Sequence, residues 1–173
     1  MGKKIAILGP ECTGKTTLAA QLAQHFHGIW VPEYAREYVA RLNRKYTFED
    51  VEHIAKVQIQ QIQSIDDQIT WAFFDTELII TKVWFEVVFG HEPPWFEEAI
   101  LNNRFDLYLL TDTAIPWQPD PVRENGGEMR EILFRKYEDY LRKYQFPFHI
   151  VTGLKQQRLD HAIQWILQYF NLP

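Results

Sequence analysis

The sequence predicts an α/β fold in which a mostly parallel five-stranded sheet carries helices on both faces. Short apolar runs of strand length alternate along the chain with longer segments of helical periodicity. Each of the apolar runs also ends within two residues of an acidic residue or a glycine. Strict alternation of strand and helix favours parallel strands joined by helical crossovers. At 173 residues, the chain has the length of one domain, so residues 1–173 are expected to fold as a single unit.

The expected strands are short and rich in aliphatic and aromatic residues. Inner strands of a parallel sheet are buried on both faces, so they read as continuous apolar runs. The second of these strands should stop at Pro32, because proline lacks the donor that a ladder needs. The five predicted strands cover residues 5–8, 29–31, 72–74, 106–110 and 148–151.

The expected helices fill the intervals between these strands. Glu49 and Asp50 favour the start of one of them through the helix dipole, and Gly90 is a plausible C-cap for another. The segment 113–127 contains three prolines and two glycines, and it is too long to be a mere connection. The predicted helices cover residues 15–26, 33–44, 48–68, 79–89, 93–103, 128–144 and 158–170.

The composition of the chain indicates which binding partners and which cellular compartment to expect. The net charge is −5 and there is no basic run, which gives no support for nucleic-acid binding. A single cysteine rules out an internal disulfide and fits a reducing compartment. No targeting segment or membrane-spanning stretch is visible, so a cytoplasmic location is expected. The expected partner is a small-molecule substrate rather than nucleic acid or membrane, and a homo-oligomer is left open.

One motif carries specific chemistry. The segment after the first strand fits G-x-x-x-x-G-K-[ST] and is followed by a helix, the context in which such a loop binds phosphates. Its glycines let backbone N–H groups point inward, and the helix adds its N-terminal dipole. Lys15 is expected to reach the β- and γ-phosphates of ATP, and Thr16 to ligate Mg²⁺. The predicted phosphate-binding residues are Gly9, Pro10, Glu11, Cys12, Thr13, Gly14, Lys15, Thr16 and Thr17.

Acidic residues follow the other strands, at the sheet edge where ligands of such folds bind. Asp75 is the candidate second Mg²⁺ ligand, although it could instead cap the following helix. Glu33 is the candidate general base for a substrate hydroxyl. The alternative for Glu33 is an acid in the first helical turn, which stabilises the helix through its dipole. The residues alone leave these two roles of Glu33 equally open.

Cations and aromatic residues complete the candidate site. Arg123 is predicted to deliver positive charge to the transferred phosphoryl group from a closing loop, with Arg130 at the loop exit. The alternative for Arg130 is a helix-surface residue, which suits it better than it suits Arg123, and Arg36 could either clamp a substrate or be solvated. Tyr34 and Trp84 are candidates to stack on a flat heteroaromatic substrate, against the alternative that they belong to the core.

Three blocks of sequence resemble a known family. The loop from Gly9 to Thr16, the block 31–38 (Val-Pro-Glu-Tyr-Ala-Arg-Glu-Tyr) and the block 73–84 (from Phe-Phe-Asp-Thr-Glu to Trp84) resemble the ribosylnicotinamide kinase domain of the NadR proteins, in stand-alone form. That domain is an AAA-like ATP-binding domain of the P-loop NTPase class. The family more often has serine at position 12 and aspartate at position 77, and neither difference removes a phosphate or metal ligand.

The resemblance implies a fold like that of the nucleoside and nucleotide kinases, with a lid over about 113–127. It further implies an adenine-contacting loop from Thr152 to Arg158, which brings in Gly153 and Arg158 as cofactor-binding residues. The implied reaction is transfer of a phosphoryl group from ATP to the 5′-hydroxyl of nicotinamide riboside, giving nicotinamide mononucleotide. In the related kinases an acid after the second strand is the base, which is Glu33 by position.

Two other functions stay open from the sequence. One is a deoxynucleoside or nucleotide kinase, which the same motifs would serve. The other is a regulatory P-loop ATPase that hydrolyses ATP without an added acceptor. A GTPase is disfavoured, because no Asn-Lys-x-Asp motif is present to read guanine.

Overall fold

The computed structural model describes residues 2–173 and contains one sheet of five strands in the order β2-β3-β1-β4-β5. Every strand ladder in the sheet is parallel. The predicted α/β fold is therefore confirmed. The strands are β1 (Lys3–Leu8), β2 (Ile29–Val31), β3 (Trp71–Asp75), β4 (Leu107–Thr111) and β5 (Phe148–Val151).

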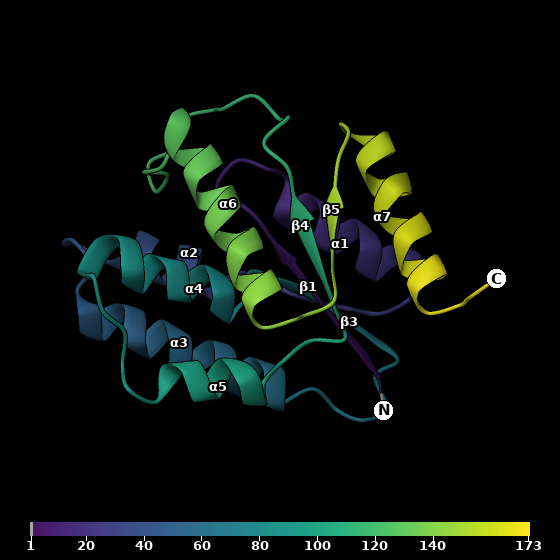
Figure 1. The fold of residues 1–173 in the computed structure, drawn as a ribbon, viewed down its shortest axis with the longest axis horizontal. Helices are drawn as coiled ribbons and strands as arrows, with labels where there is room; N and C mark the ends of the chain where they lie inside the picture. The colour runs from purple at the N-terminus through teal and green to yellow at the C-terminus, as the bar shows by residue number, and fades with distance from the viewer. Residues whose placement is uncertain (1) are drawn as a thin grey trace.

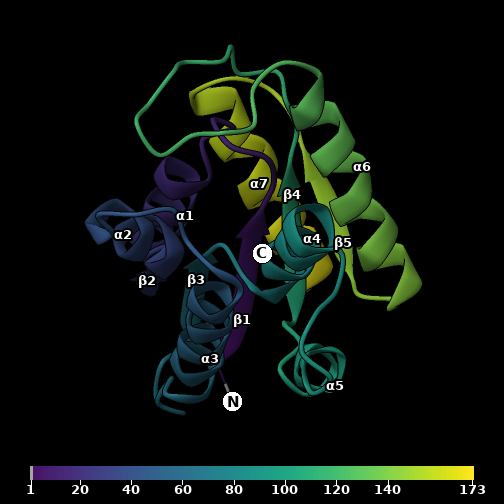
Figure 2. The same ribbon diagram turned by 90° about the vertical axis from the view of Figure 1, so that its left-hand side faces the viewer.

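Helices cover both faces of the sheet, as Figures 1 and 2 show. One face carries α1 (Lys15–His25) and α7 (Gln156–Tyr169), which pack against each other. The other face carries α3 (Phe48–Gln63), α4 (Leu78–Trp84), α5 (Phe96–Asn102) and α6 (Glu128–Lys143), while α2 (Tyr34–Arg41) lies against α3.

Alternation along the strands sends successive side chains to opposite faces and so divides the core in two. In β1, Ile5 and Ile7 pack under α1 and α7, while Ala6 and Leu8 face the other helices. All four are fully buried, as expected of an inner strand of a parallel sheet.

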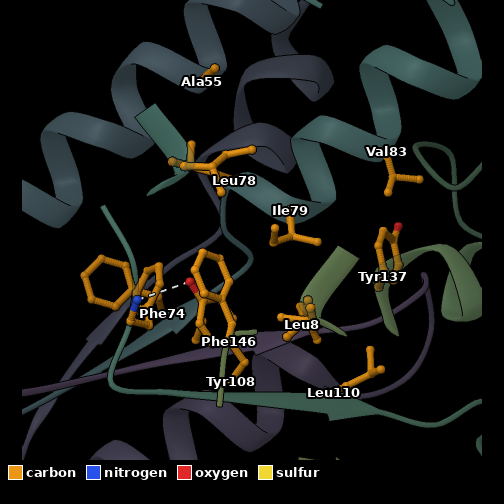
Figure 3. Packing of buried hydrophobic residues seen from close by; sticks show 14 of the residues in the cluster. Leu8, Ala55, Phe74, Leu78, Ile79, Val83, Tyr108, Leu110, Tyr137 and Phe146 are labelled. Carbon is orange, nitrogen blue, oxygen red and sulfur yellow. Dashed lines mark hydrogen bonds between the residues drawn. The ribbon is translucent and has the colours of Figure 1, made fainter. Parts of the chain in front are cut away.

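Aromatic residues fill much of the larger half of the core. Tyr108 of β4 stacks on Phe146 with 5.0 Å between ring centroids, and its hydroxyl accepts a hydrogen bond from the backbone N–H of Phe105 at 3.1 Å (Figure 3). Pairing this hydroxyl matters, because a buried polar group without a partner destabilises the fold. Tyr137 of α6 lies at the other end of this cluster, beside Val83 of α4 (Figure 3).

Most helices begin and end within three residues of their predicted bounds, and two differ more. The helix predicted over 48–68 ends at Gln63, because Asp66 closes a turn by accepting the backbone N–H of Gln68 at 2.8 Å. The helix predicted over 79–89 is α4 followed by a π-helical turn, η1 (Phe85–Phe89), which ends at Gly90 with φ 73°. The predicted C-cap at Gly90 is therefore confirmed.

The segment between β4 and α6 contains no helix or strand, in agreement with the predicted loop over 113–127. In Figure 2 this segment arches over the carboxyl edge of the sheet. We call residues 113–127 the lid. The lid closes over the edge at which the polar residues after β1, β2 and β3 meet.

Candidate functional site

The loop between β1 and α1 has a backbone that favours glycine at two positions. Gly9 has φ 148°, and a Cβ atom there would lie 2.2 Å from the Oγ1 of Thr111. Gly14 has φ 78° and forms the N-cap of α1. Both glycines of the motif are required by local geometry, and the loop opens its backbone at the N-terminus of α1, where an anion is stabilised.

Buried polar contacts hold this loop from beneath. Arg158 is only 3% exposed, and its Nη1 donates to the carbonyl of Thr13 at 2.8 Å. Its Nε donates to the carbonyl of Gly153 at 2.9 Å, and it forms an ion pair with Asp112. The structure thus gives Arg158 a bracing role, and Arg158 does not line the cleft described below. The nucleotide contacts expected of Gly153 and Arg158 stay predictions.

Lys15, Thr16 and Asp75 meet above the sheet edge. The Lys15 Nζ donates to the carbonyl of Pro10 at 3.0 Å, and the Thr16 hydroxyl donates to Asp75 Oδ2 at 2.5 Å. The other carboxylate oxygen of Asp75 is buried without a partner. Burial raises the pKa of Asp75, while Lys15 and the Thr16 hydrogen bond oppose this effect.

The structure also decides which acid caps α4. Glu77 is the N-cap residue, and its Oε2 accepts the backbone N–H of Ile79 at 2.8 Å. Burial raises the pKa of Glu77 to about 8. The alternative reading of Asp75 as the helix cap is therefore wrong, and its carboxylate is free to face Thr16.

Glu33 is the N-cap residue of α2, but its side chain makes no capping hydrogen bond. The carboxylate lines the cleft instead. It keeps some exposed surface, yet protein atoms surround it closely enough that desolvation raises its pKa. Lys15 is the strongest opposing influence, and Asp75 adds to the rise. Glu33 thus lies within electrostatic reach of both phosphate-loop and strand-end charges.

Lys15, Thr16 and Glu33 line one cleft with a volume of about 290 Å³, and Asp75 lies beneath it, bonded to Thr16. The predicted residues that it brings together are Gly9, Glu11, Cys12, Thr13, Gly14, Lys15, Thr16, Thr17, Glu33, Arg36, Trp84 and Arg123. One end is the phosphate-binding loop, and the other has apolar walls. Such a shape suits a ligand with an anionic end and a flat, weakly polar end.

Tyr34 does not line the cleft, which corrects its predicted role in stacking on the substrate. Its ring packs beside Tyr38, and its hydroxyl lies 3.0 Å from His53 Nε2. Tyr34 and Tyr38 are four residues apart and share one face of α2, whereas Arg36 and Val39 share the face that lines the cleft. The helical phase of α2 therefore turns Tyr34 away.

Sequence reasoning missed most of the apolar wall. The helical spacing from Trp84 could have found part of it, because residues three or four positions away lie on the same face. Ile80, Val87 and Val88 satisfy that spacing and line the cleft. The missed residues are Ala35, Val39, Tyr46, Thr76, Ile80, Val83, Val87, Val88, Val122, Glu124, Asn125, Leu133 and Tyr137.

The lid is held against the phosphate-binding loop by several contacts. The carboxylate of Glu11 accepts the backbone N–H groups of Glu124 at 3.0 Å and Asn125 at 2.7 Å. Arg36 of α2 forms an ion pair with Asp120 of the lid, so Arg36 is not simply a solvated residue. Arg123 lines the cleft and donates to the carbonyl of Gln118 at 2.6 Å.

Arg130 is buried rather than a helix-surface residue. Its Nη2 donates to the carbonyls of Cys12 at 3.1 Å and Ile115 at 2.8 Å, so it joins the phosphate-binding loop to the lid. Its guanidinium carbon also lies 5.9 Å from the ring centroid of Trp117. Arg130 does not line the cleft, so its predicted contact with the nucleotide stays a prediction.

Residues 2–173 contain neither a membrane-spanning helix nor a cluster of metal-binding side chains. No helix there is long and apolar enough to cross a membrane. No group of three or more His, Cys, Asp and Glu side chains there is arranged to hold a metal ion. Thr16 and Asp75 are too few to enclose a metal, but Mg²⁺ commonly completes its shell with phosphate oxygens and water.

A parallel sheet whose first strand runs into such a loop, with Thr16 bonded to the strand-end carboxylate of Asp75, defines a P-loop nucleotide-binding protein. The chain belongs to the AAA domain family, whose family model matches residues 4–158.

The chain is similar in sequence to part of two longer bacterial proteins. It is 30% identical over 138 residues to the trifunctional NAD biosynthesis/regulator protein NadR of Salmonella typhimurium, covering 77% of this chain and 34% of that protein. The NadR protein of Escherichia coli is 31% identical over the same length, with the same coverage. The chain thus spans about a third of the length of these relatives.

Solved structures share the fold. A NadR protein in complex with NR superposes with a TM-score of 0.82 at 24% identity, over 99% of this chain and 52% of that chain. A deoxyadenosine kinase from M. mycoides gives a TM-score of 0.66 at 19% identity, over 97% of this chain and 98% of that chain. At these identities the likeness shows the fold, which agrees with the predicted nucleoside-kinase-like architecture.

Proposed function

We propose that this protein is an ATP-dependent kinase that phosphorylates the 5′-hydroxyl of nicotinamide riboside and so forms nicotinamide mononucleotide. The observation that carries the proposal is the cleft itself, in which Glu33 lies with the phosphate-binding loop and an apolar-walled pocket. The relatives named for NAD biosynthesis, and the NadR structure with bound NR, support the choice of acceptor.

The phosphate-binding end fits ATP and Mg²⁺. Thr16 and Asp75 would hold Mg²⁺, and the buried, unpartnered Oδ1 of Asp75 is an oxygen suited to the ion or to one of its waters. The ion would neutralise charge on the β- and γ-phosphates. Lys15 would move its ammonium group from the Pro10 carbonyl to the phosphates, which are the stronger acceptors. Support for ATP also comes from a NadR neighbour solved with AMP-PNP.

The apolar end fits a small ring. Trp84 lines it beside Tyr46, whose ring meets Trp84 edge-on with 4.8 Å between centroids. The pyridinium ring of nicotinamide riboside is cationic, so aromatic faces attract it by roughly 0.5–2 kcal/mol.

Glu33 is the proposed general base. Its carboxylate makes no capping bond and lies in the cleft within electrostatic reach of Lys15 and Asp75. The raised pKa of Glu33 makes it a stronger base than an exposed glutamate. It would take the proton of the 5′-hydroxyl as the oxygen attacks the γ-phosphorus and the bond to the β-phosphate oxygen breaks.

A deoxynucleoside kinase is the second candidate, because deoxyadenosine kinases share the fold along almost their whole length. The test compares nicotinamide riboside, thymidine and deoxycytidine as acceptors under identical ATP and Mg²⁺. We expect the riboside to give the highest kcat/KM. A faster deoxynucleoside would move the protein to the second candidate, and ATP hydrolysis unaffected by all three would favour a regulatory ATPase.

The same assay tests the base. Glu33→Gln should lose most of the turnover, about a hundredfold or more, with little change in the affinity for an ATP analogue. Glu37→Gln is the matched control, because Glu37 lies on the same helix, outside the cleft, and pairs with Arg41. Equal turnover of the Glu33 variant and the control would remove Glu33 from the mechanism.

A further inference from the structure

Thr76 has a backbone conformation that its side chain disfavours. Its φ is 77°, in the left-handed region, and its backbone N–H donates to the carbonyl of Ile7 at 3.0 Å. Of the six non-glycine residues with positive φ between residues 2 and 173, Thr76 is the only one branched at Cβ. Such a residue in this region is an outlier, and strain of this kind gathers at ligand sites.

The side chain of Thr76 is also unpartnered. It is 6% exposed, and its Oγ1 has no hydrogen-bond partner. Three other buried side-chain atoms among residues 2–173 share this state, on Asp75, Glu77 and Arg130. Only Thr76 among these four residues lines the cleft. Because native proteins rarely bury an unpaired hydroxyl, this group calls for a partner supplied by a ligand.

The order of the strands in the sheet indicates which part of a ligand would lie beside the Thr76 hydroxyl. β3 lies between β2 and β1, and Thr76 directly follows its last residue. β2 leads to Glu33 at its carboxyl end, and β1 leads to the phosphate-binding loop. Thr76 is therefore at the junction between the proposed base and the phosphates, where the acceptor's sugar must lie for transfer to occur.

We propose that the Thr76 hydroxyl is a contact residue for the acceptor and hydrogen-bonds a sugar hydroxyl of it. This inference rests on the proposed function, since it requires an acceptor that carries such hydroxyls. Phosphate oxygens already have the loop N–H groups and Lys15 as donors. A threonine hydroxyl both donates and accepts, which matches the double character of an alcohol. The left-handed backbone fixes Thr76 at the junction before the acceptor arrives, and the acceptor would complete the hydrogen bonding of its Oγ1.

The test uses Thr76→Val, which keeps the shape and the branching at Cβ but removes the hydroxyl, and Thr76→Ser, which keeps the hydroxyl. Calorimetry measures the affinity for nicotinamide riboside in the presence of Mg²⁺ and an ATP analogue, and steady-state kinetics give kcat/KM. Thr76→Val should weaken riboside affinity and lower kcat/KM by about tenfold to a hundredfold, as loss of a buried hydrogen bond predicts. Thr76→Ser should stay within about threefold of wild type.

Thr81→Val is the matched control. Thr81 is also buried, but its hydroxyl donates to Gln58 at 2.7 Å, and neither residue lines the cleft. That variant should lower the melting temperature and leave kcat/KM unchanged, whereas Thr76→Val should keep the melting temperature. Wild-type kcat/KM and riboside affinity in Thr76→Val would overturn the proposal, as would a matching loss of affinity for the ATP analogue.

The design separates this proposal from the proposed function. A wild-type protein that binds the riboside in a Thr76-dependent way but does not phosphorylate it would refute the kinase assignment and support the contact. A protein that phosphorylates the riboside equally well with valine at position 76 would do the reverse. Absence of both binding and turnover with every riboside and deoxynucleoside would overturn both.

Discussion

At the scale of single residues, the phosphate-binding loop shows how a motif becomes a geometry. Gly9 and Gly14 carry backbone angles that other residues adopt with strain, and the crowding at Gly9 leaves no room for a Cβ atom. Cys12 adopts φ 58° between them, and its sulfur lies 3.4 Å from the Pro116 carbonyl and the Gln118 nitrogen. The motif residues thus contact the lid as well as the phosphate-binding space.

The first prediction concerns Lys15. Lys15→Ala should lower ATP-dependent turnover at least about a hundredfold, because the variant loses the mobile positive charge that follows the γ-phosphate. The melting temperature should hold, since the only hydrogen bond of the Lys15 side chain is to the Pro10 carbonyl. Lys45→Ala, at an exposed site, is the control for loss of a lysine. Wild-type turnover in Lys15→Ala would falsify the phosphate-binding assignment.

The second prediction concerns Asp75. Asp75→Asn should weaken nucleotide binding in the presence of Mg²⁺ by roughly 10–100-fold, while binding without Mg²⁺ changes little, because the neutral amide is a poor partner for the cation. Calorimetry with and without Mg²⁺ measures both affinities. If the two fall by the same factor, Asp75 shapes the loop through Thr16 and does not serve the metal.

At the scale of elements, the lid joins parts of the chain that are far apart in sequence. Glu11, Arg36 and Arg130 each contact it, from the phosphate-binding loop, α2 and α6 respectively. The π-helical turn η1 also contributes to the cleft, because its residues Val87 and Val88 form part of the wall. Both keep more than a third of their surface exposed. Such turns are frequent at functional sites.

The third prediction concerns the lid cation. Arg123→Ala should lower kcat by about tenfold or more and change KM less, because charge on the transferred phosphoryl group is greatest in the transition state. Arg135→Ala, at an exposed position of α6, is the control for loss of an arginine. An unchanged kcat would exclude Arg123 from the chemistry and leave it a lid-structuring residue bonded to Gln118.

At the scale of the whole molecule, each edge strand of the sheet has a strand neighbour on one side only, so helix packing also helps to hold it in place. β5 is one edge strand, and it packs against α7. In this contact the ring of His149 stacks on that of Trp165 with 3.6 Å between ring centroids. His149 Nε2 also lies 3.2 Å from His161 Nε2. Burial lowers the pKa of His149 from its usual 6.5 to about 4, and the nearby His161 adds to this effect.

The fourth prediction follows from this lowered pKa. Between about pH 6.5 and pH 4 the unfolded chain binds a proton at His149 that the folded chain does not, so stability contributed here is lost as pH falls through that window. Partial exposure limits the loss to about 1–2 kcal/mol. Urea unfolding of wild type and His149→Phe at several pH values measures it. The variant keeps the stack and should have a shallower decline, whereas parallel curves would contradict the assignment.

The sequence by itself determined the α/β class, the parallel sheet, the phosphate-binding loop and the acids that follow the strands. Each of these is a local signal, because periodicity, glycine geometry and strand-end position depend on neighbouring residues. It did not decide whether Asp75 caps the following helix, and it did not show that Tyr34 lies outside the cleft. Those outcomes depend on which face of a helix meets the sheet, and on Glu77 capping α4 in place of Asp75.

Only the tertiary structure decided which distant residues share the cleft. Tyr46, Val122 and Tyr137 meet there from three separate segments, and no local pattern records their approach. The same is true of Arg130 and Arg158, whose positive charges read as surface or ligand groups in sequence but brace the phosphate-binding loop from buried positions. A charged group can be buried only where it has hydrogen-bond partners, and these partners come within reach only when the chain folds. The bracing roles of the two arginines therefore cannot be predicted from local sequence.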